Sequence, residues 1–160
     1  MGSFFKYWMP LFLWIAVIFV GSTDVMSAEQ TSRFIAPFLR WLKPDVTAAM
    51  IAQVQFFVRK AAHLGEYAIL AMMLWRAARH GTNIKVKMSI LFVLVWVACA
   101  MFAAADEFHQ SFVPTRTAAF GDVLIDICGA IAGLIVCMMF VARGRSRSLN
   151  QETRKPPKER

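Results

Sequence analysis

Charged residues are scarce in this chain, because they make up 18% of its 160 residues whereas hydrophobic residues make up 58%. A soluble domain of this size needs more charged surface than that to cover its core. A membrane-spanning helix requires roughly 20 mainly apolar residues, and four such stretches, together with the loops between them, use up nearly the whole chain. The scarcity of charge therefore predicts one membrane domain and leaves no room for a soluble catalytic domain.

Cysteine is also rare. The 3 cysteines are odd in number and lie inside apolar runs. They form neither the even, spaced set of a disulfide framework nor a Cys-x-x-Cys metal motif. Cys99, Cys128 and Cys137 are therefore predicted to be small buried apolar residues.

Most of the positive charge lies in two short segments. The net charge is +8, and residues 143–160 and 76–87 hold eleven of the 18 Lys and Arg. Such clusters flank membrane spans on the cytoplasmic side, and no folded basic module accompanies them, so we expect no nucleic-acid binding. Both termini are thus predicted to be cytoplasmic, with residues 24–60 and 106–120 outside. The cations within 24–60 are the one discordant feature.

The apolar runs predict an all-α, polytopic bundle of four transmembrane helices. They cover residues 4–21, residues 61–75 within a long helix from about 47 to 79, residues 88–105 and residues 121–142. A cleaved signal peptide is the alternative for the first run, because Lys6 precedes a short apolar region. The many Phe and Trp residues of that run favour an uncleaved helix.

The segment between the first two helices, residues 24–47, is basic and amphipathic. Its apolar residues recur at helical spacing: Phe34, Ile35, Phe38, Leu39 and Leu42. Together with Trp41, this pattern predicts a short interfacial amphipathic helix in the first outer loop. Pro37 leaves a loop that packs on the helix ends as the alternative.

The end of the chain differs in composition from the rest. Residues 143–160 are rich in Arg, Ser, Lys and Pro, a composition that cannot bury a core. We therefore predict a transmembrane domain over residues 1–142 and a disordered, basic, cytoplasmic tail over residues 143–160.

Acidic residues occur where the membrane should be. They are Glu66, Asp106, Glu107, Asp122 and Asp126. A charge near the bilayer centre costs at least about 2.5–3.5 kcal/mol, so it normally faces partners or a wet cavity. At a rise of about 1.5 Å per residue, Glu66 lies about 15 Å above Arg76, near mid-bilayer, and Asp106 and Asp122 lie at the outer rim. This series predicts a cavity that is open to the outside.

Helical spacing aligns these residues with other polar side chains. Lys60, His63, Glu66 and Tyr67 share one face of the second helix. Asp122 and Asp126 are one turn apart, as are Asp106 and Gln110 if the third helix extends that far. Arg116 is the cation of the second outer loop.

Gly129-x-x-x-Gly133 permits close approach of another helix, either within the chain or in a homo-oligomer.

A purely structural interpretation also fits these residues. Arg59, Lys60 and Arg116 could neutralise the acids and hold the helices together without any chemistry. The gathering of five acids with a His, a Tyr and a Gln on one side favours a functional cavity.

Metal binding is a further alternative. His63 with Glu66, and Asp106 with His109, are spaced as in a bundle metal site. Because neighbouring Arg and Lys side chains would compete with a cation, we predict neither a metal nor another cofactor.

Two motifs, in this order, resemble those of the VanZ-like family. They are Arg59-Lys60-x-x-His63-x-x-Glu66-Tyr67 and Asp106-Glu107-x-x-Gln110-x-Phe112-x-Pro114-x-Arg116. The similarity continues through Asp122, Asp126 and Gly129, and its motif core covers about residues 45–142. It implies a small multi-pass protein of the bacterial plasma (inner) membrane, whose namesake accompanies resistance to glycopeptide antibiotics, chiefly teicoplanin.

We therefore expect recognition of an amphiphile, either a lipid-linked envelope component or a lipoglycopeptide such as teicoplanin. The expected binding residues are Arg59, Lys60, Tyr67, Asp106, Glu107, Gln110, Arg116, Asp122 and Asp126. If chemistry occurs, His63 and Glu66 are the acid/base candidates. A membrane hydrolase or transferase that acts on a lipid-linked substrate is the first alternative. A small transporter or a structural subunit of a membrane complex is the second.

Overall fold

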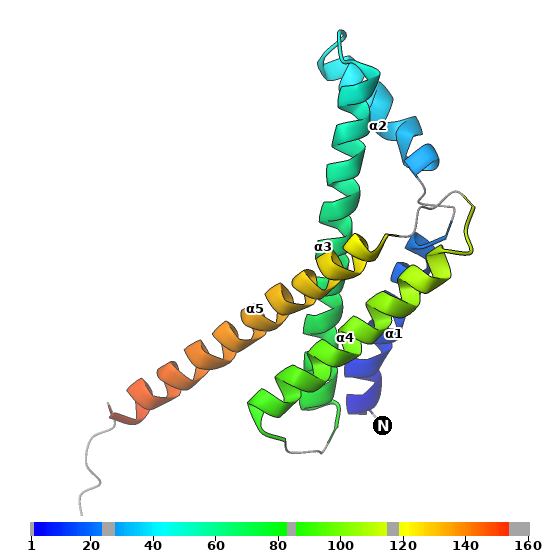
Figure 1. Ribbon diagram of the computed structural model, residues 1–160. Coiled ribbons are helices and arrows are strands. Elements are labelled where there is room, and N and C mark those ends of the chain that lie inside the picture. The colour runs from blue at the N-terminus through cyan, green and yellow to red at the C-terminus, as the bar shows by residue number, and fades with distance from the viewer. Residues whose placement is uncertain (1, 24–27, 83–85, 115–118, 154–160) are drawn as a thin grey trace, which may run out of the picture.

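The computed structural model describes residues 2–23, 28–82, 86–114 and 119–153, and all regular elements in these ranges are α-helices. They are α1 (Gly2–Gly21), α2 (Ala28–Leu42), α3 (Ala48–His80), α4 (Met88–Gln110) and α5 (Phe120–Thr153). The all-α prediction is confirmed for this part of the chain, and the order of the helices is visible in Figure 1.

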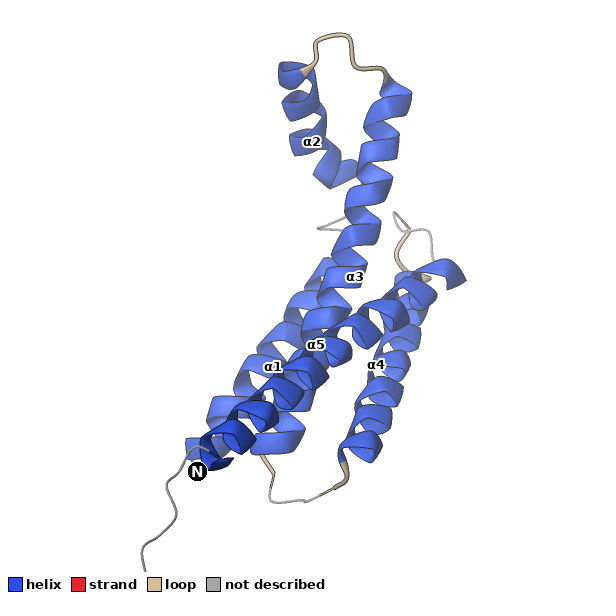
Figure 2. Ribbon diagram, turned by 90° about the vertical axis from the view of Figure 1, so that its left-hand side faces the viewer, coloured by secondary structure: helices blue, strands red, loops and turns tan. Residues whose placement is uncertain are grey.

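The long helix α3 is the centre of the arrangement, because α1, α2, α4 and α5 all pack against it. Its 33 residues correspond to about 50 Å, which exceeds the hydrocarbon thickness of about 30 Å. Figures 1 and 2 show α1 and α4 beside its C-terminal part and α2 beside its N-terminal part, while α5 crosses α3 near its middle and, in Figure 1, then diverges from it.

The prediction that residues 24–47 contain a helix is confirmed by α2, which runs through Pro37. The long helix also begins where the sequence indicates. Thr47 is its N-cap, and the Thr47 hydroxyl accepts a hydrogen bond from the backbone N–H of Met50 at 3.2 Å, which satisfies one of the free donors of the first turn.

Three helices of the described ranges are long and apolar enough to cross a membrane: α1 over Phe4–Gly21, α4, and α5 over Phe120–Arg147. Their outer surfaces carry large exposed apolar side chains, such as Phe5 (61%), Met101 (68%) and Phe140 (68%). Exposed apolar area of this extent marks a membrane-facing surface. The architecture is therefore that of a membrane protein, although α3 is too polar to count as a fourth apolar span.

The apolar core lies between the C-terminal part of α3 and its three neighbours. Its central members are Tyr67, Leu70, Ala71 and Trp75 of α3, Val95, Cys99 and Ala103 of α4, Ala130 and Leu134 of α5, and Leu11 and Ile18 of α1. Two further hydrogen bonds fix α1 to α3, since the indole N–H of Trp14 donates to the Glu66 carbonyl at 3.0 Å and that of Trp8 to the Gly81 carbonyl at 3.4 Å.

Helices α3 and α5 cross at backbone contact. A Cβ atom at Gly129 would collide with the carbonyl oxygen of Leu64, and one at Gly133 with the carbonyl oxygen of Ala68. The Gly-x-x-x-Gly pair thus serves an intramolecular crossing. In this arrangement the two glycines are covered by α3 and do not offer a surface for a homo-oligomer.

Three expectations differ from the structure. Helix α5 continues to Thr153, so the prediction of a disordered tail is wrong for residues 143–153, and residues 154–160 lie outside the described ranges. Helix α4 continues to Gln110, which places Asp106 and Glu107 on a helix rather than in a loop. Cys99 is buried, but Cys128 is exposed and Cys137 half-buried: Cys128 lies off the stripe of Gly129 and Gly133, whereas Cys137 follows Gly133 by one turn and packs partly against the core.

Gly129→Ala should lower the free energy of unfolding by about 1–3 kcal/mol, because the new methyl group overpacks against a backbone carbonyl. Gly144→Ala, on the same helix, is the matched control, since a Cβ atom there meets no neighbour within 4 Å and alanine raises helix propensity. Unfolding in mixed detergent micelles, followed by circular dichroism, measures both. Equal stability of the two variants would contradict the close crossing.

Candidate functional site

The polar side chains gather at one end of the bundle, where α1 and α4 end and α5 begins. Ser22 follows the last residue of α1, Gln110 is the last residue of α4, and Asp122 lies in the first turn of α5. Helix α3 passes through this level and continues beyond it. The side chains that these helix ends direct inward therefore meet one face of α3.

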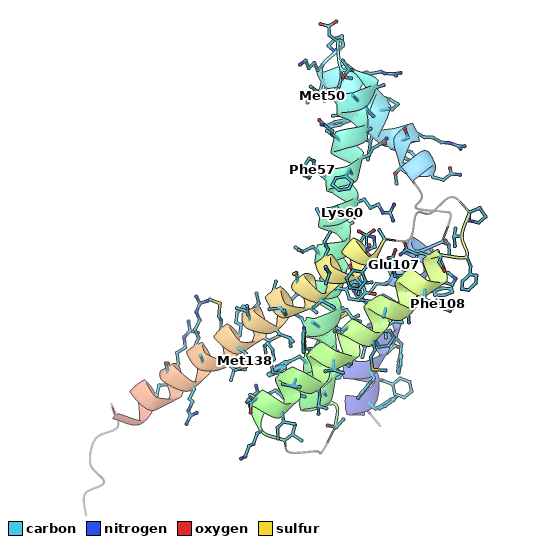
Figure 3. All side chains as sticks on the ribbon, viewed as in Figure 1. Met50, Phe57, Lys60, Glu107, Phe108 and Met138 are labelled. Carbon is cyan, nitrogen blue, oxygen red and sulfur yellow. The ribbon has the colours of Figure 1, made fainter. Side chains whose placement is uncertain are left out.

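Asp122 is the centre of an ion-pair cluster between α3 and α5. Its Oδ2 lies 3.4 Å from Nη2 of Arg59, and its Oδ1 pairs with Nζ of Lys60. The Asp122 side chain is 1% exposed, whereas Arg59 and Lys60 are 26% and 21% exposed. Figure 3 shows Lys60 and Glu107 close to the first turns of α5. Asp122 is further stabilised by the positive end of the α5 dipole.

His63 and Asp126 form a second pair, one turn further along both helices. Nδ1 of His63 lies 3.1 Å from Oδ1 of Asp126, and both side chains are buried. A carboxylate at Nδ1 holds that nitrogen protonated and fixes the orientation of the ring. Nε2 of His63 is then the nitrogen left for proton exchange.

Gln110 connects α1 with α4 at this level. Its Nε2 donates to Oδ2 of Asp106 at 3.0 Å and approaches Oγ of Ser22 at 3.4 Å. Glu107, on the same turn of α4, accepts a hydrogen bond from the backbone N–H of Ala119 and so fixes the start of α5. The predicted pairing of Asp106 with Gln110 is confirmed, because α4 extends far enough to place them one turn apart.

A cavity of about 400 Å³ opens beside these pairs, between α3, α2 and the ends of α1 and α4. It is lined by Gly21, Ser22, Thr31, Ile35, Ala52, Gln55, Phe56, Val58, Arg59, Ala62, His63, Glu66 and Gln110. The α3 members recur at helical spacing from Ala52 to Glu66, a stripe of about 21 Å. The cavity therefore follows one face of α3 for about four turns.

Three buried polar atoms of the cavity lining have no hydrogen-bond partner among the described residues. They are Nε2 of Gln55, Nε of Arg59 and Oε1 of Gln110. Gln110 is 0% exposed, so bulk solvent does not reach it. Because an unsatisfied buried polar group costs about 1–3 kcal/mol, these three atoms mark where a polar ligand would gain most.

A second, smaller cavity of about 240 Å³ lies between α1, α3 and α4. Its walls are mainly apolar, with Asp106, His109 and the buried Tyr67 among them. The ring of His109 lies against that of Phe19, with a centroid distance of 4.7 Å and a tilt of 36°, and it does not join His63. Within the described ranges, no three His, Cys, Asp or Glu side chains are arranged to hold a metal ion.

A family model for VanZ/LLP1 matches residues 7–141. The chain belongs to the VanZ/LLP1 family. This match confirms the resemblance drawn from the two motifs, and it extends the similarity to the first helix. No curated protein and no solved structure matches the chain.

The motif residues of this VanZ/LLP1 protein divide into three groups. Those that line the larger cavity are Arg59, His63, Glu66 and Gln110. Those that pair with the lining or fix the helices behind it are Lys60, Asp106, Glu107, Asp122 and Asp126. Tyr67 faces the smaller cavity, and Arg116 lies outside the described residues.

Glu66 lies against the second half of α1. Its backbone carbonyl accepts the hydrogen bond from Trp14, and a Cβ atom at Gly21 would lie 4.0 Å from its Oε1, so the carboxylate reaches toward the end of α1. Sequence reasoning missed Gln55 and the α2 residues Thr31 and Ile35. For Gln55 a signal exists, because it lies one turn before Arg59 on the same face.

Asp122→Ala should lower the free energy of unfolding by about 3 kcal/mol, because two partly buried cations lose their partner. Asp45→Ala is the control, since Asp45 is exposed in the loop before α3 and should cost less than about 0.5 kcal/mol. Detergent-titrated unfolding measures both variants. A change at Asp122 as small as that at Asp45 would show that the ion pairs do not hold α3 to α5.

Proposed function

We propose that this protein binds an amphiphile in the 400 Å³ cavity, with the polar group toward His63, Glu66 and Gln110. The proposal rests on one observation: the same cavity contains buried polar atoms without a described hydrogen-bond partner and an apolar wall. Unpartnered donors at Gln55 and Arg59 lie beside Phe56 and other apolar residues. Pockets for small ligands combine an apolar lining with a few orienting polar groups in this way.

We further propose that α3 crosses the membrane as the fourth span. Its polar face is covered by the other helices, and charged side chains in a membrane are tolerated when they face the bundle interior and pair with one another. The basic linker and tail argue for cytoplasmic termini. The cavity would then open toward the outside of a bacterial plasma membrane.

Helix α2 fits the membrane interface in this placement. Phe34 and Trp41 are 79% and 78% exposed on one face, and the exposed Arg33 and Arg40 lie on another. A helix with separate aromatic and basic faces lies in the plane of the interface. The cavity beneath α2 would then be accessible to a lipid-linked envelope component or to a lipoglycopeptide such as teicoplanin.

One observation favours a second candidate, hydrolysis of the bound amphiphile. Asp126 holds Nδ1 of His63, which leaves Nε2 to take a proton from a water molecule that attacks an ester. The leaving alcohol would receive that proton in return. Arg59 in the same cavity would stabilise the negative charge that develops.

Replacement of Ala62 by Trp should block binding, because Ala62 lines the cavity and the indole fills it. Ala61→Trp is the matched control, since Ala61 is exposed and outside the lining. Native mass spectrometry of detergent-purified protein, incubated with equal amounts of phosphatidylethanolamine and phosphatidylglycerol, measures retained lipid. We expect Ala62→Trp to lower it at least about tenfold, a change of 1.4 kcal/mol, and Ala61→Trp to leave it unchanged. Unchanged retention by both would overturn the proposal.

His63→Gln separates the two candidate functions. Binding alone predicts that the variant retains lipid within about threefold, a change below 1 kcal/mol. Hydrolysis predicts that wild-type protein releases product that mass spectrometry detects, and that His63→Gln releases none. If wild-type protein yields no product from either phospholipid, the hydrolytic candidate fails for these substrates.

A further inference from the structure

The end of the bundle that lies away from the 400 Å³ cavity is basic. Figures 1 and 2 show that α1 begins, α3 ends and α4 begins at this end. The described cations there are Lys6 of α1, Arg76 and Arg79 of α3, and Lys87 at the N-cap of α4. They come from three helices that are separate in the sequence, so the fold brings them together.

No acidic residue comes from the segments that form this end. The ten acidic residues of the chain lie within residues 24–66, 106–126 and 152–159. The last of these ranges lies at and beyond the end of α5, and Figure 1 shows that α5 diverges from α3. The ion pairs among the described residues join α3 to α5 near the start of α5. The cations of the basic end therefore have no carboxylate partner in the described part of the chain.

Tyr7 is the centre of this basic cluster. Cζ of Arg76 lies 5.1 Å and Nζ of Lys6 lies 5.4 Å from the centroid of the Tyr7 ring. His80, one turn after Arg76, stacks on the same ring with a centroid distance of 5.7 Å and an interplanar angle of 30°. Cation–π contacts hold both charges beside one ring, although like charges repel each other. An anion that binds both cations would remove this repulsion.

The residues around Lys6 fit the surface of a membrane. Phe5 and Met9 are 61% and 52% exposed, and Phe4 stacks on Trp8 at a centroid distance of 5.9 Å. Aromatic residues gather where a helix meets the lipid headgroups, and a lysine extends its charge to that level from an apolar stem. Lys6 is exposed as well, so its ammonium group would lie at the level of the lipid phosphates.

We propose that this end of the bundle binds an anionic phospholipid, with Lys6 and Arg76 at its phosphate group and Tyr7 positioning the two cations. Basic pockets between membrane-spanning helices bind the headgroups of anionic lipids, and a guanidinium offers paired N–H donors to phosphate oxygens. Both cations are exposed and accessible. The inference does not rest on the proposed cavity ligand, because the two sites share no residue.

The site should discriminate against zwitterionic lipids. Phosphatidylcholine has the same phosphate group as phosphatidylglycerol, but it adds a quaternary ammonium group that Lys6 and Arg76 repel. Aromatic rings can bind such a group, yet the Tyr7 ring is in contact with two cations of the chain itself. Phosphatidylglycerol should therefore bind more tightly.

Titration of the full chain in detergent with phosphatidylglycerol tests the inference, with native mass spectrometry to count bound lipids. An exposed site exchanges its lipid, so it is measured at equilibrium and not by retention. We expect Arg76→Gln and Lys6→Gln each to raise the apparent Kd about fivefold. Arg40→Gln and Lys43→Gln are the matched controls, since both residues are exposed and lie away from the basic end, and they should behave as wild type.

Two outcomes of this titration would overturn the site. One is an unchanged Kd in Arg76→Gln and Lys6→Gln. The other is an equal increase in the controls, because the lipid would then respond only to the net charge. Tyr7→Leu keeps the charges but removes the ring and should weaken binding about threefold, whereas Tyr7→Phe should not. Equal affinity of these two variants would overturn the positioning role of Tyr7.

Three further arms identify the ligand and its location. Phosphatidylcholine should bind about fivefold more weakly than phosphatidylglycerol, and equal affinity would overturn the requirement for an anionic lipid. Glycerol 3-phosphate at the same concentration should displace no lipid, and effective competition would assign the site to a soluble phosphate. Ala62→Trp, which fills the cavity, should leave the effects of Arg76→Gln and Lys6→Gln intact. Their loss would place the lipid in the cavity and overturn the basic site.

Discussion

The backbone contact between α3 and α5 determines the rest of the structure. Gly129 and Gly133 allow α5 to reach the carbonyls of Leu64 and Ala68. Just before this crossing the side chains of the two helices meet in pairs, Lys60 with Asp122 and His63 with Asp126, and beyond it α5 diverges from α3 (Figure 1). A larger residue at either glycine would separate the helices and, with them, both polar pairs. The ion pairs thus depend on two residues that carry no charge.

This dependence matters because buried charges are stable only in pairs. Asp122 and Asp126 are each 1% exposed, and removal of one partner from a buried pair leaves an uncompensated charge. The pairs are formed by the faces of α3 and α5 that meet each other. The α3 face next to them, which carries Gln55 and Arg59, is turned toward the cavity and keeps unpartnered atoms. One helix therefore supplies both the structural contacts and the proposed ligand contacts.

Much of this arrangement could be predicted from the sequence. Long apolar runs and the uninterrupted segment from about residue 47 to 79 indicate the helices, and the helical spacing of Lys60, His63 and Glu66 predicts their common face. The neighbour of Glu66 could not be predicted, because counting residues along α3 says nothing of α1, which ends beside this carboxylate. Gln55 was missed because it is uncharged and lies in a segment that mixes polar and apolar residues. Nothing in the sequence therefore indicates that its side-chain amide is buried. The pattern Gly-x-x-x-Gly likewise indicates a close contact but does not identify the partner helix.

Helix α2 supports the proposal of an amphiphile over that of a small polar ligand. Thr31 and Ile35, one turn apart, form part of the cavity wall, whereas Phe34 and Trp41 are exposed on the neighbouring face. A helix whose aromatic face lies in the membrane interface would therefore cover the cavity with its adjacent face. A ligand that reaches the polar end of the cavity must then pass along α2 at the level of the lipid headgroups. A molecule with an apolar tail is already concentrated at that level, and its headgroup has only to move sideways between α2 and α3.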